Sequence, residues 1–352
     1  MSSRTILVMD IKNLIRKNIK ALTPYSSARD EFTEVADVYL DANENPFENG
    51  YNRYPDPYQK KVKERLSEIK KVPVANMLLG NGSDEVLDLI FRAFCEPGED
   101  NIVSHNPSYG MYPVLAEVNN IQINKVPLDQ GFQLNAEQMV EASDEHTKIF
   151  FVCSPNNPSG NLLAKEEIQK LLDLEKALVV IDEAYIDFSD EESWLYELEK
   201  YENLIVCQTL SKAWGLAGIR LGMCYSSEEI ISVLNAIKPP YNVNELTQQK
   251  ALEMLNDEAT YQSNLNTILQ EKKKLEEVLP KLDCILEVFP SDANFFLVRV
   301  ADANALYYFL LKRKVIVRNR SKEHLCENCL RLTVGTPEEN EKLVEGLREY
   351  EL

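Results

Sequence analysis

The sequence predicts an α/β fold, with a large domain built on a mostly parallel sheet flanked by helices and a smaller C-terminal α+β domain. Between residues 60 and 225, short apolar runs alternate with amphipathic stretches, which is typical of βαβ units. After Pro239 and Pro240 the pattern changes to a long helical stretch followed by further strands and helices. A chain of 352 residues is long enough for two such domains.

The chain is expected to begin with an N-terminal arm over residues 1–40. This arm should contain a short amphipathic helix near 10–20 and a loop with Pro24 and Tyr25. Residues 41–58 are dense in Asn, Pro and Tyr. They are predicted to form a loop, because three prolines interrupt regular secondary structure there.

The large domain is expected over residues 41–238. Its predicted strands are Met77–Leu79, Asn101–Ser104, Ile121–Val126, Lys148–Cys153, Leu178–Ile181, Leu204–Gln208 and Ile219–Cys224. Amphipathic stretches between them predict helices at Asp84–Cys95, Tyr109–Val118 and Lys165–Glu175.

The small domain is expected over residues 239–352, after a hinge at 236–244. A long helix is predicted over about 245–279, because the helical pattern runs through that stretch. The predicted strands are Ile285–Phe289, Asn294–Val300, Lys314–Val317 and Cys329–Val334, and further helices are predicted near 303–313 and 337–350.

The charge balance argues against two classes of partner. A formal net charge of −19 attracts neither nucleic acid nor an anionic membrane. The N-terminal sequence lacks the pattern of a signal peptide, and no stretch reaches the roughly 18 apolar residues of a transmembrane helix. A cytoplasmic protein is therefore expected.

The seven cysteines do not form the pattern of a disulfide framework. Cys326 and Cys329 make one C-x-x-C pair with His324 nearby, but one pair cannot complete a four-ligand zinc site. Redox or metal use stays open beside the simpler interpretation of two half-buried cysteines near a strand. No bound metal is expected.

The most informative segment is TLSKAWGLAGIRLG over residues 209–222. Its glycines let the backbone approach a ligand closely, while Ser211 and Arg220 suit a phosphate. The amine of Lys212 can form a Schiff base with an aldehyde, and pyridoxal phosphate (PLP) carries both an aldehyde and a phosphate. A surface lysine before a glycine turn would explain Lys212 alone, but not the rest of the segment.

The segment GNGSDE over residues 80–85 ends a predicted strand and opens a helix. Backbone N–H groups at a helix N-terminus bind anions, so this segment is a second candidate for holding a phosphate. Ser83 and Asp84 are also good helix caps, and plain capping stays an alternative for this segment.

Two further segments follow apolar strands. Asp182 ends the strand in VVIDEAYIDF, where a buried carboxylate needs a charged partner such as a protonated pyridine nitrogen. Capping of a helix by Asp182 is the alternative. Asn157 in CSPNNPSG is held by neighbouring prolines, and its amide could bond the cofactor's phenolic oxygen, although the segment is also a good turn.

Together these segments resemble the fold-type I PLP-dependent enzymes, the aspartate aminotransferase superfamily, and within it the histidinol-phosphate aminotransferases (class II). The matching motifs run in order along nearly the whole chain: DANENPF (41–47), RYPD (53–56), GNGSDE (80–85), YGMY (109–112), CSPNNPSG (153–160), IDEAYIDF (181–188), TLSKAWGLAGIRLG (209–222), PYNVN (240–244) and LRLTVGTPEEN (330–340).

The resemblance implies a PLP site with three catalytic residues. Lys212 would hold the cofactor and shuttle a proton, Asp182 would pair with the ring nitrogen, and Tyr185 would bond the phenolic oxygen together with Asn157. Tyr109 would stack on the ring. The phosphate would be held by Ser83, Asp84, Ser211 and Arg220, and by Tyr54 from the other subunit of a homodimer.

The resemblance also implies the substrate site. Arg331 would grip the carboxylate or phosphate of the substrate, and Arg318 would supply a second cation. Tyr25 would close over the phosphate, and Asn157 would also bind the substrate. A surface cation is the alternative for Arg318. Trp214 departs from the phenylalanine frequent at its position, which should alter packing near the lysine and leave the chemistry intact.

The expected activity is transamination between histidinol phosphate and 2-oxoglutarate, with imidazole-acetol phosphate and glutamate as products, in histidine biosynthesis. A phosphothreonine-type decarboxylase or an aromatic aminotransferase would share most of this site. A PLP-binding sensor domain of a transcription regulator is the non-enzymatic alternative. The net charge of −19 and the lack of a basic helix-turn-helix segment argue against it.

Overall fold

A seven-stranded sheet forms the centre of the larger part of the protein. The structure, a computed structural model, describes residues 10–24 and 36–350. The strand order is β1-β7-β6-β5-β4-β2-β3. The strands are β1 Met77–Asn81, β2 Asn101–Asn106, β3 Gln122–Pro127, β4 Thr147–Cys153, β5 Leu178–Asp182, β6 Leu204–Thr209 and β7 Leu221–Tyr225. Strands β2 to β6 are parallel, and β7 runs antiparallel to its neighbours β6 and β1, so the predicted α/β fold is confirmed.

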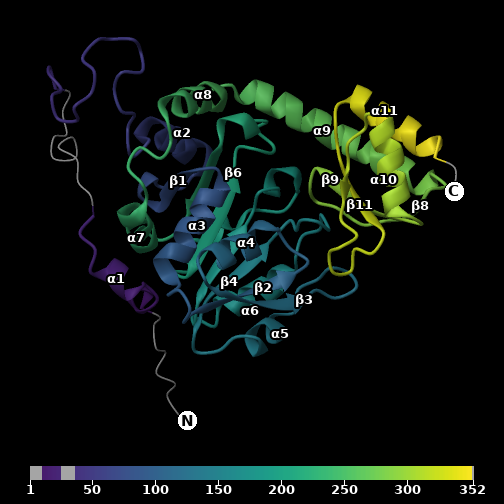
Figure 1. The fold of residues 1–352 in the computed structure, drawn as a ribbon, viewed down its shortest axis with the longest axis horizontal. Helices are drawn as coiled ribbons and strands as arrows, with labels where there is room; N and C mark the ends of the chain where they lie inside the picture. The colour runs from purple at the N-terminus through teal and green to yellow at the C-terminus, as the bar shows by residue number, and fades with distance from the viewer. Residues whose placement is uncertain (1–9, 25–35, 351–352) are drawn as a thin grey trace.

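Helices cover both faces of this sheet, as Figure 1 shows. One face packs against α2 Lys60–Lys70, α5 Ala136–Glu141, α6 Lys165–Leu172 and α8 Glu245–Leu255. The other packs against α3 Ser83–Phe94, α4 Met111–Val118 and α7 Glu228–Ile237. This arrangement explains why the strand sequences are continuously apolar, because a strand covered on both faces buries all of its side chains. Every residue of β5 is buried, with Val179 on one face and Val180 on the other.

The smaller part is a four-stranded antiparallel sheet in the order β10-β11-β9-β8. Its strands are β8 Ile285–Val288, β9 Phe295–Val300, β10 Arg318–Asn319 and β11 Cys329–Thr333. One apolar face of this sheet is covered by three helices. They are α10 Ala303–Lys312, α11 Pro337–Arg348 and the end of α9 Glu258–Val278. Helix α9 connects the two parts (Figure 1). The predicted domain boundary between residues 238 and 239 stays a prediction.

Two predicted elements of the small domain differ from the structure. The prediction of a single long helix over 245–279 is wrong, because the helix is interrupted between α8 and α9. There the Asp257 side chain accepts a hydrogen bond from the Thr260 N–H and caps α9. The strand at Lys314–Val317 is also wrong. Lys314 has a φ of 62°, and the Val315 N–H donates to the Leu310 carbonyl, so this stretch completes the end of α10.

The predicted helix near 10–20 is divided into a 3₁₀ turn, Ile11–Asn13, and the short helix α1 Lys17–Lys20. Ile11 is buried in the cluster that contains α3 residues, and the Arg16 guanidinium donates to the Arg92 carbonyl. These contacts attach the segment to the end of α3. Within the described ranges, no helix is long and apolar enough to cross a membrane.

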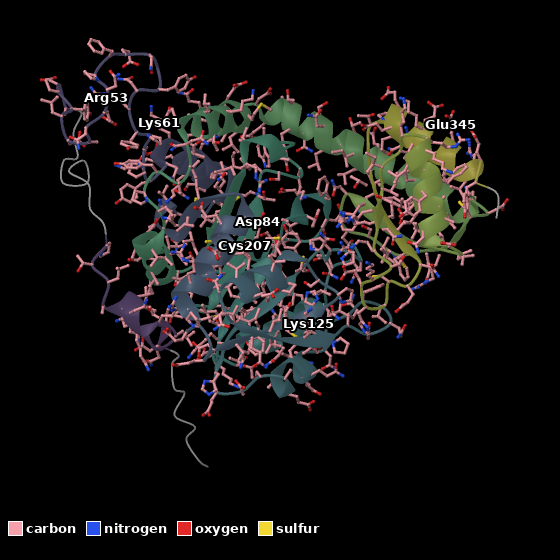
Figure 2. All side chains as sticks on the ribbon, in the orientation of Figure 1. Arg53, Lys61, Asp84, Lys125, Cys207 and Glu345 are labelled. Atoms are coloured by element: carbon pink, nitrogen blue, oxygen red, sulfur yellow. The ribbon has the colours of Figure 1, made fainter. Side chains whose placement is uncertain are left out.

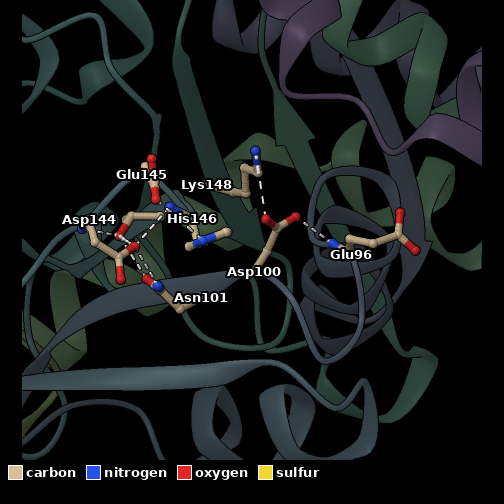
Figure 3. Close-up of polar contacts among 8 residues, drawn as sticks. Glu96, Asp100, Asn101, Asp144, Glu145, His146 and Lys148 are labelled. Atoms are coloured by element: carbon tan, nitrogen blue, oxygen red, sulfur yellow. Dashed lines mark hydrogen bonds and ion pairs between the residues drawn. The ribbon is translucent and has the colours of Figure 1, made fainter.

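A polar network ties together the N-terminal ends of β2 and β4 (Figure 3). Asn101 donates to Asp144 at 2.8 Å and accepts a hydrogen bond from the Thr147 hydroxyl at 2.7 Å. Asp100 pairs with Lys148 at 3.7 Å and accepts a bond from the Glu96 backbone N–H. These carboxylates and amides already have bonding partners within the protein. They lie at the N-terminal ends of the strands, away from the carboxyl ends, so they have a structural role.

The C-x-x-C pair is more deeply buried than predicted. Cys326 and Cys329 are both free thiols with no exposed surface, in the core cluster beneath the large sheet. Burial raises the pKa of Cys326 to about 12 and that of Cys329 to about 11. Neither thiol is therefore ionised near neutral pH, which favours the structural interpretation of the pair.

Candidate active site

A cleft opens where β4, β5 and β6 end at their carboxyl side. Parallel strands of α/β proteins bind ligands at this edge. The residues lining the cleft are Ser83, Asp84, Tyr109, Cys153, Asn157, Asp182, Ala184, Tyr185, Thr209, Ser211, Lys212 and Arg220.

Lys212 lies in the loop that follows β6. Thr209 shapes this loop, because its hydroxyl donates to Ser211 Oγ at 2.9 Å and accepts from the Ser211 N–H at 3.1 Å. The turn then closes through the Gly215 N–H and the Lys212 carbonyl, with Gly215 at a φ of +67°. Desolvation in the cleft lowers the pKa of Lys212, and nearby Arg331 lowers it further, which raises the fraction of neutral, nucleophilic amine.

Asp182 is the last residue of β5 and is 3% exposed. One carboxylate oxygen accepts from the Tyr112 hydroxyl at 2.9 Å and the other from the Ala184 N–H at 3.1 Å. Burial nevertheless raises its pKa to about 6. Two neutral donors thus do not offset the desolvation of this carboxylate, and a cation bound in the cleft would do so.

The N-terminus of α3 and Arg220 form the end of the cleft that suits an anion. Gly82 precedes the helix, and no side chain caps it, so the capping alternative for Ser83 and Asp84 is not observed. The Asp84 carboxylate accepts from the Tyr109 hydroxyl at 3.0 Å and lies 3.6 Å from the Arg220 guanidinium. The backbone N–H groups of this first turn are therefore the donors that suit an anion.

Two glycines make the approach of Arg220 and β7 possible. A Cβ on Gly82, which has a φ of +82°, would lie 2.6 Å from Arg220 Nη2. A Cβ on Gly222 would lie 2.1 Å from the Ser83 backbone nitrogen. Gly222 is required by close packing against the backbone at the helix N-terminus, and Gly82 is favoured by its positive φ.

We expect Gly82→Ala to displace Arg220 and to weaken phosphate binding in this cleft. The strained φ should also cost about 1 kcal/mol or more of folding free energy. Cofactor affinity, measured by titrating the cofactor-free protein, should fall at least about tenfold, as for loss of a charged hydrogen bond. Gly110→Ala is the matched control, because a Cβ there meets nothing within 4 Å. Equal effects of the two variants would contradict this account.

Asn157 connects Tyr185, which lines the cleft, with Arg331 of the small sheet. Its amide nitrogen lies 3.4 Å from the Tyr185 hydroxyl, and its oxygen accepts from Arg331 Nη1 at 2.6 Å. Burial raises the pKa of Tyr185, so its hydroxyl stays protonated and available as a donor. Arg331 comes from β11 of the small sheet, so this chain of contacts links both parts of the protein across the cleft.

Trp214 stacks on Tyr261 of α9, with ring centroids 3.9 Å apart and an angle of 14° between the rings. The stack fastens the Lys212 loop to the helix that connects the two parts. We expect Trp214→Phe to cost up to about 1 kcal/mol of stability, because a smaller stacked ring remains. Thermal unfolding should detect this loss while turnover stays within about twofold; a large fall in turnover would contradict a packing role.

Most of the predicted site residues meet in this cleft. Those that line it are Ser83, Asp84, Tyr109, Asn157, Asp182, Tyr185, Ser211, Lys212 and Arg220. Arg331 reaches the cleft through Asn157, and Arg318 lies opposite Arg331 in the β10–β11 pair with its side chain exposed. Tyr54 does not line the cleft of its own chain but stacks on Tyr241 at 4.5 Å. Tyr25 lies outside the described residues.

Sequence reasoning missed several residues around the cleft. Thr209 lies within the lysine segment and could have been included as a hydroxyl two residues before Ser211. Tyr112 is in the YGMY motif, but its bond to Asp182 joins positions 70 apart. Cys153 and Ala184 line the wall, and no chemical signal marks them.

The class I and II aminotransferase family model matches residues 25–347. The chain belongs to this family. It is 57% identical over 343 residues to the histidinol-phosphate aminotransferase of Parabacteroides distasonis, covering 97% of this chain and 99% of that protein. Class I and II aminotransferases depend on PLP, and the fold is that of the fold-type I enzymes.

Two solved structures share this architecture. The histidinol-phosphate aminotransferase of Clostridium acetobutylicum superimposes with a TM-score of 0.78 at 26% identity, covering 84% of this chain and 90% of that one. The enzyme from Sinorhizobium meliloti, solved in complex with PLP, gives a TM-score of 0.76 at 22% identity, over 84% of this chain and 82% of that one. Because the Sinorhizobium meliloti enzyme is only 22% identical to this chain, that comparison shows the fold alone.

The residues of the cleft fit PLP as this aminotransferase's cofactor. The uncapped start of α3 and Arg220 suit a phosphate at one end, and the under-compensated Asp182 carboxylate suits a ring cation at the other. The Lys212 amine and the Tyr185 hydroxyl lie in the same cleft. Figure 2 locates Asp84 in the middle of the large part of the protein and Glu345 on the small part.

Proposed function

We propose that this chain is a PLP-dependent aminotransferase that transfers the amino group of L-histidinol phosphate to 2-oxoglutarate, with imidazole-acetol phosphate and L-glutamate as products, in histidine biosynthesis. The observation that carries the proposal is one cleft lined by the Lys212 amine and the buried Asp182 carboxylate, with the Arg331 guanidinium bonded to Asn157 of its wall. The 57% identity to a histidinol-phosphate aminotransferase supports the choice of substrate.

Lys212, Asp182 and Tyr185 have the catalytic roles in this proposal. The bound cofactor withdraws electrons from the substrate α-carbon. Lys212 would hold the cofactor covalently and would then move the proton at that carbon, for which its lowered pKa suits it. Asp182 would stabilise a positive ring nitrogen, and Tyr185 and Asn157, which lie 3.4 Å apart, would hold the phenolic oxygen. Tyr109 supports the ring, and its hydroxyl is fixed by Asp84.

The substrate end of the site consists of Arg331, Asn157 and Arg318. A guanidinium binds both carboxylates and phosphates through two parallel hydrogen bonds, so one pocket can accept glutamate and a phosphate ester in turn. Asn157 orients Arg331 for this task through the 2.6 Å bond. We place Tyr25 over the phosphate, as the resemblance implies.

We also propose a homodimer that shares its active sites. Residues 36–58 extend away from the large sheet (Figure 1). Their exposed large apolar side chains are Val38, Leu40, Phe47, Tyr51, Tyr54 and Tyr58. An apolar surface of this kind suits a second copy of the chain, to which Tyr54 would contribute its hydroxyl. The proposed location of the enzyme is the cytoplasm.

A glutamate-coupled assay tests the function. The purified enzyme, loaded with PLP, receives histidinol phosphate, phenylalanine or phosphothreonine as amino donor with 2-oxoglutarate. We expect glutamate to form fastest with histidinol phosphate. Good turnover of another donor without turnover of histidinol phosphate would refute the substrate, and release of carbon dioxide from phosphothreonine would indicate a decarboxylase.

A further inference from the structure

Three buried polar atoms around the β10–β11 hairpin have no hydrogen-bond partner among the described residues. They are Arg320 Nε, Ser321 Oγ and Arg331 Nε. Buried polar atoms in folded proteins are nearly always bonded, so unbonded donors gathered in one hairpin indicate a ligand. Arg320 was not among the residues that the motifs predicted.

The strand register places Arg320 on the same face of the small sheet as Arg331. Arg318 lies directly opposite Arg331, and Arg320 follows two residues later. The Arg320 N–H donates to the Cys329 carbonyl at 2.9 Å, which continues the pairing. Leu330 between these positions packs into the small core on the opposite face. Arg320 is therefore a diagonal neighbour of Arg331 on the same face of the small sheet.

Positive charge exceeds negative charge in this cluster. Among the described residues, the only carboxylate paired with Arg318, Arg320 or Arg331 is Glu323, which lies 3.5 Å from Arg320 Nη2. Desolvation lowers the pKa of Arg331, and the nearby charges of Arg320 and Arg318 lower it further. Arg320 is only 12% exposed in its side chain, so solvent does not provide the missing partner. Three guanidinium groups with one carboxylate favour a ligand with two negative charges.

We propose that Arg320 is a specificity-determining residue that binds the phosphate of the amino donor together with Arg331. The inference rests on the proposed function and adds a residue that neither the motifs nor the resemblance assigned. A phosphate ester carries nearly two negative charges at neutral pH, whereas each glutamate carboxylate carries one. Arg320 therefore contributes more to the half-reaction of histidinol phosphate than to that of glutamate, and Glu323 neutralises it when no dianion is bound.

The test measures the two half-reactions separately with the PLP-loaded enzyme. Arg320→Gln should raise the KM for histidinol phosphate about 10- to 100-fold, as for a lost hydrogen bond to a charged group, with a smaller change in kcat. The KM for glutamate should rise less than about threefold. Inorganic phosphate, used as a competitive inhibitor of the glutamate half-reaction, should bind correspondingly more weakly.

Lys322→Gln is the matched control, since it removes the same charge from an exposed position in the same loop. It should leave both KM values unchanged. Arg320→Lys keeps the charge and should recover part of the phosphate affinity, which separates ligand binding from folding of the hairpin. Equal rises in both KM values, or none, would overturn the role of Arg320. A wild type that ignores histidinol phosphate but uses another donor would instead refute the proposed function.

Discussion

Lys212→Ala should abolish transamination and covalent cofactor binding together. In the proposed mechanism the variant lacks both the amine that binds the cofactor and the base that moves the proton at the substrate α-carbon, so turnover should fall by about 10⁴-fold. The visible absorption band of the lysine-bound cofactor should disappear from the purified protein. Stopped assays with histidinol phosphate and an absorption spectrum check both expectations.

The fold should not change in this variant, because the Lys212 side chain is exposed to the cleft and makes no hydrogen bond among the described residues. Lys125→Ala on β3 is the matched control, since it removes an exposed lysine of the same large part, labelled in Figure 2. It should keep the absorption band and full turnover. A Lys212→Ala protein that retained the band would show that another amine binds the cofactor.

The sequence predicts most of the residues that gather in the cleft, because they belong to short local motifs at strand ends. Asp182 follows an apolar run and Lys212 follows another, and parallel strands bring their carboxyl ends together at one edge. The order of the strands could not be derived in this way. The antiparallel position of β7 between β1 and β6 depends on pairings between residues far apart in sequence.

The contacts that the sequence did not predict join distant positions. Tyr112 bonds Asp182 across 70 residues, and Arg331 bonds Asn157 across 174. Arg320 resembles any polar loop residue until the register of β10 with β11 is known. The break before α9 was missed for a different reason, because the helical pattern continues through Asp257, and only its capping bond ends one helix and starts the next.

Asp182→Asn should retain the shape of the cleft and lose most of the activity. The amide still accepts the Tyr112 hydrogen bond but carries no negative charge, which in the proposed mechanism stabilises the positive ring nitrogen. Turnover should fall about 10²- to 10³-fold, as for loss of one preorganised electrostatic contact. Asp187→Asn is the matched control, because Asp187 lies five residues further on and pairs with Lys70 instead of lining the cleft. A control that lost equal activity would contradict a specific role for Asp182.

The same substitution should stabilise the cofactor-free protein, with a defined pH dependence. Burial raises the pKa of Asp182 from 3.8 to about 6, so the folded state holds its proton more tightly than the unfolded state. Protonated Asp182 therefore contributes to the free energy of unfolding below about pH 4, and this stabilisation is lost as the pH rises through about 6. At neutral pH the loss amounts to about 3 kcal/mol of folding stability. Denaturant unfolding of the cofactor-free proteins should show Asp182→Asn more stable than wild type at pH 7.5 and the gap narrowing at pH 4.5. A gap of the same size at both pH values would mean that the buried charge of Asp182 is not its source, and that the carboxylate is already compensated without a bound cation.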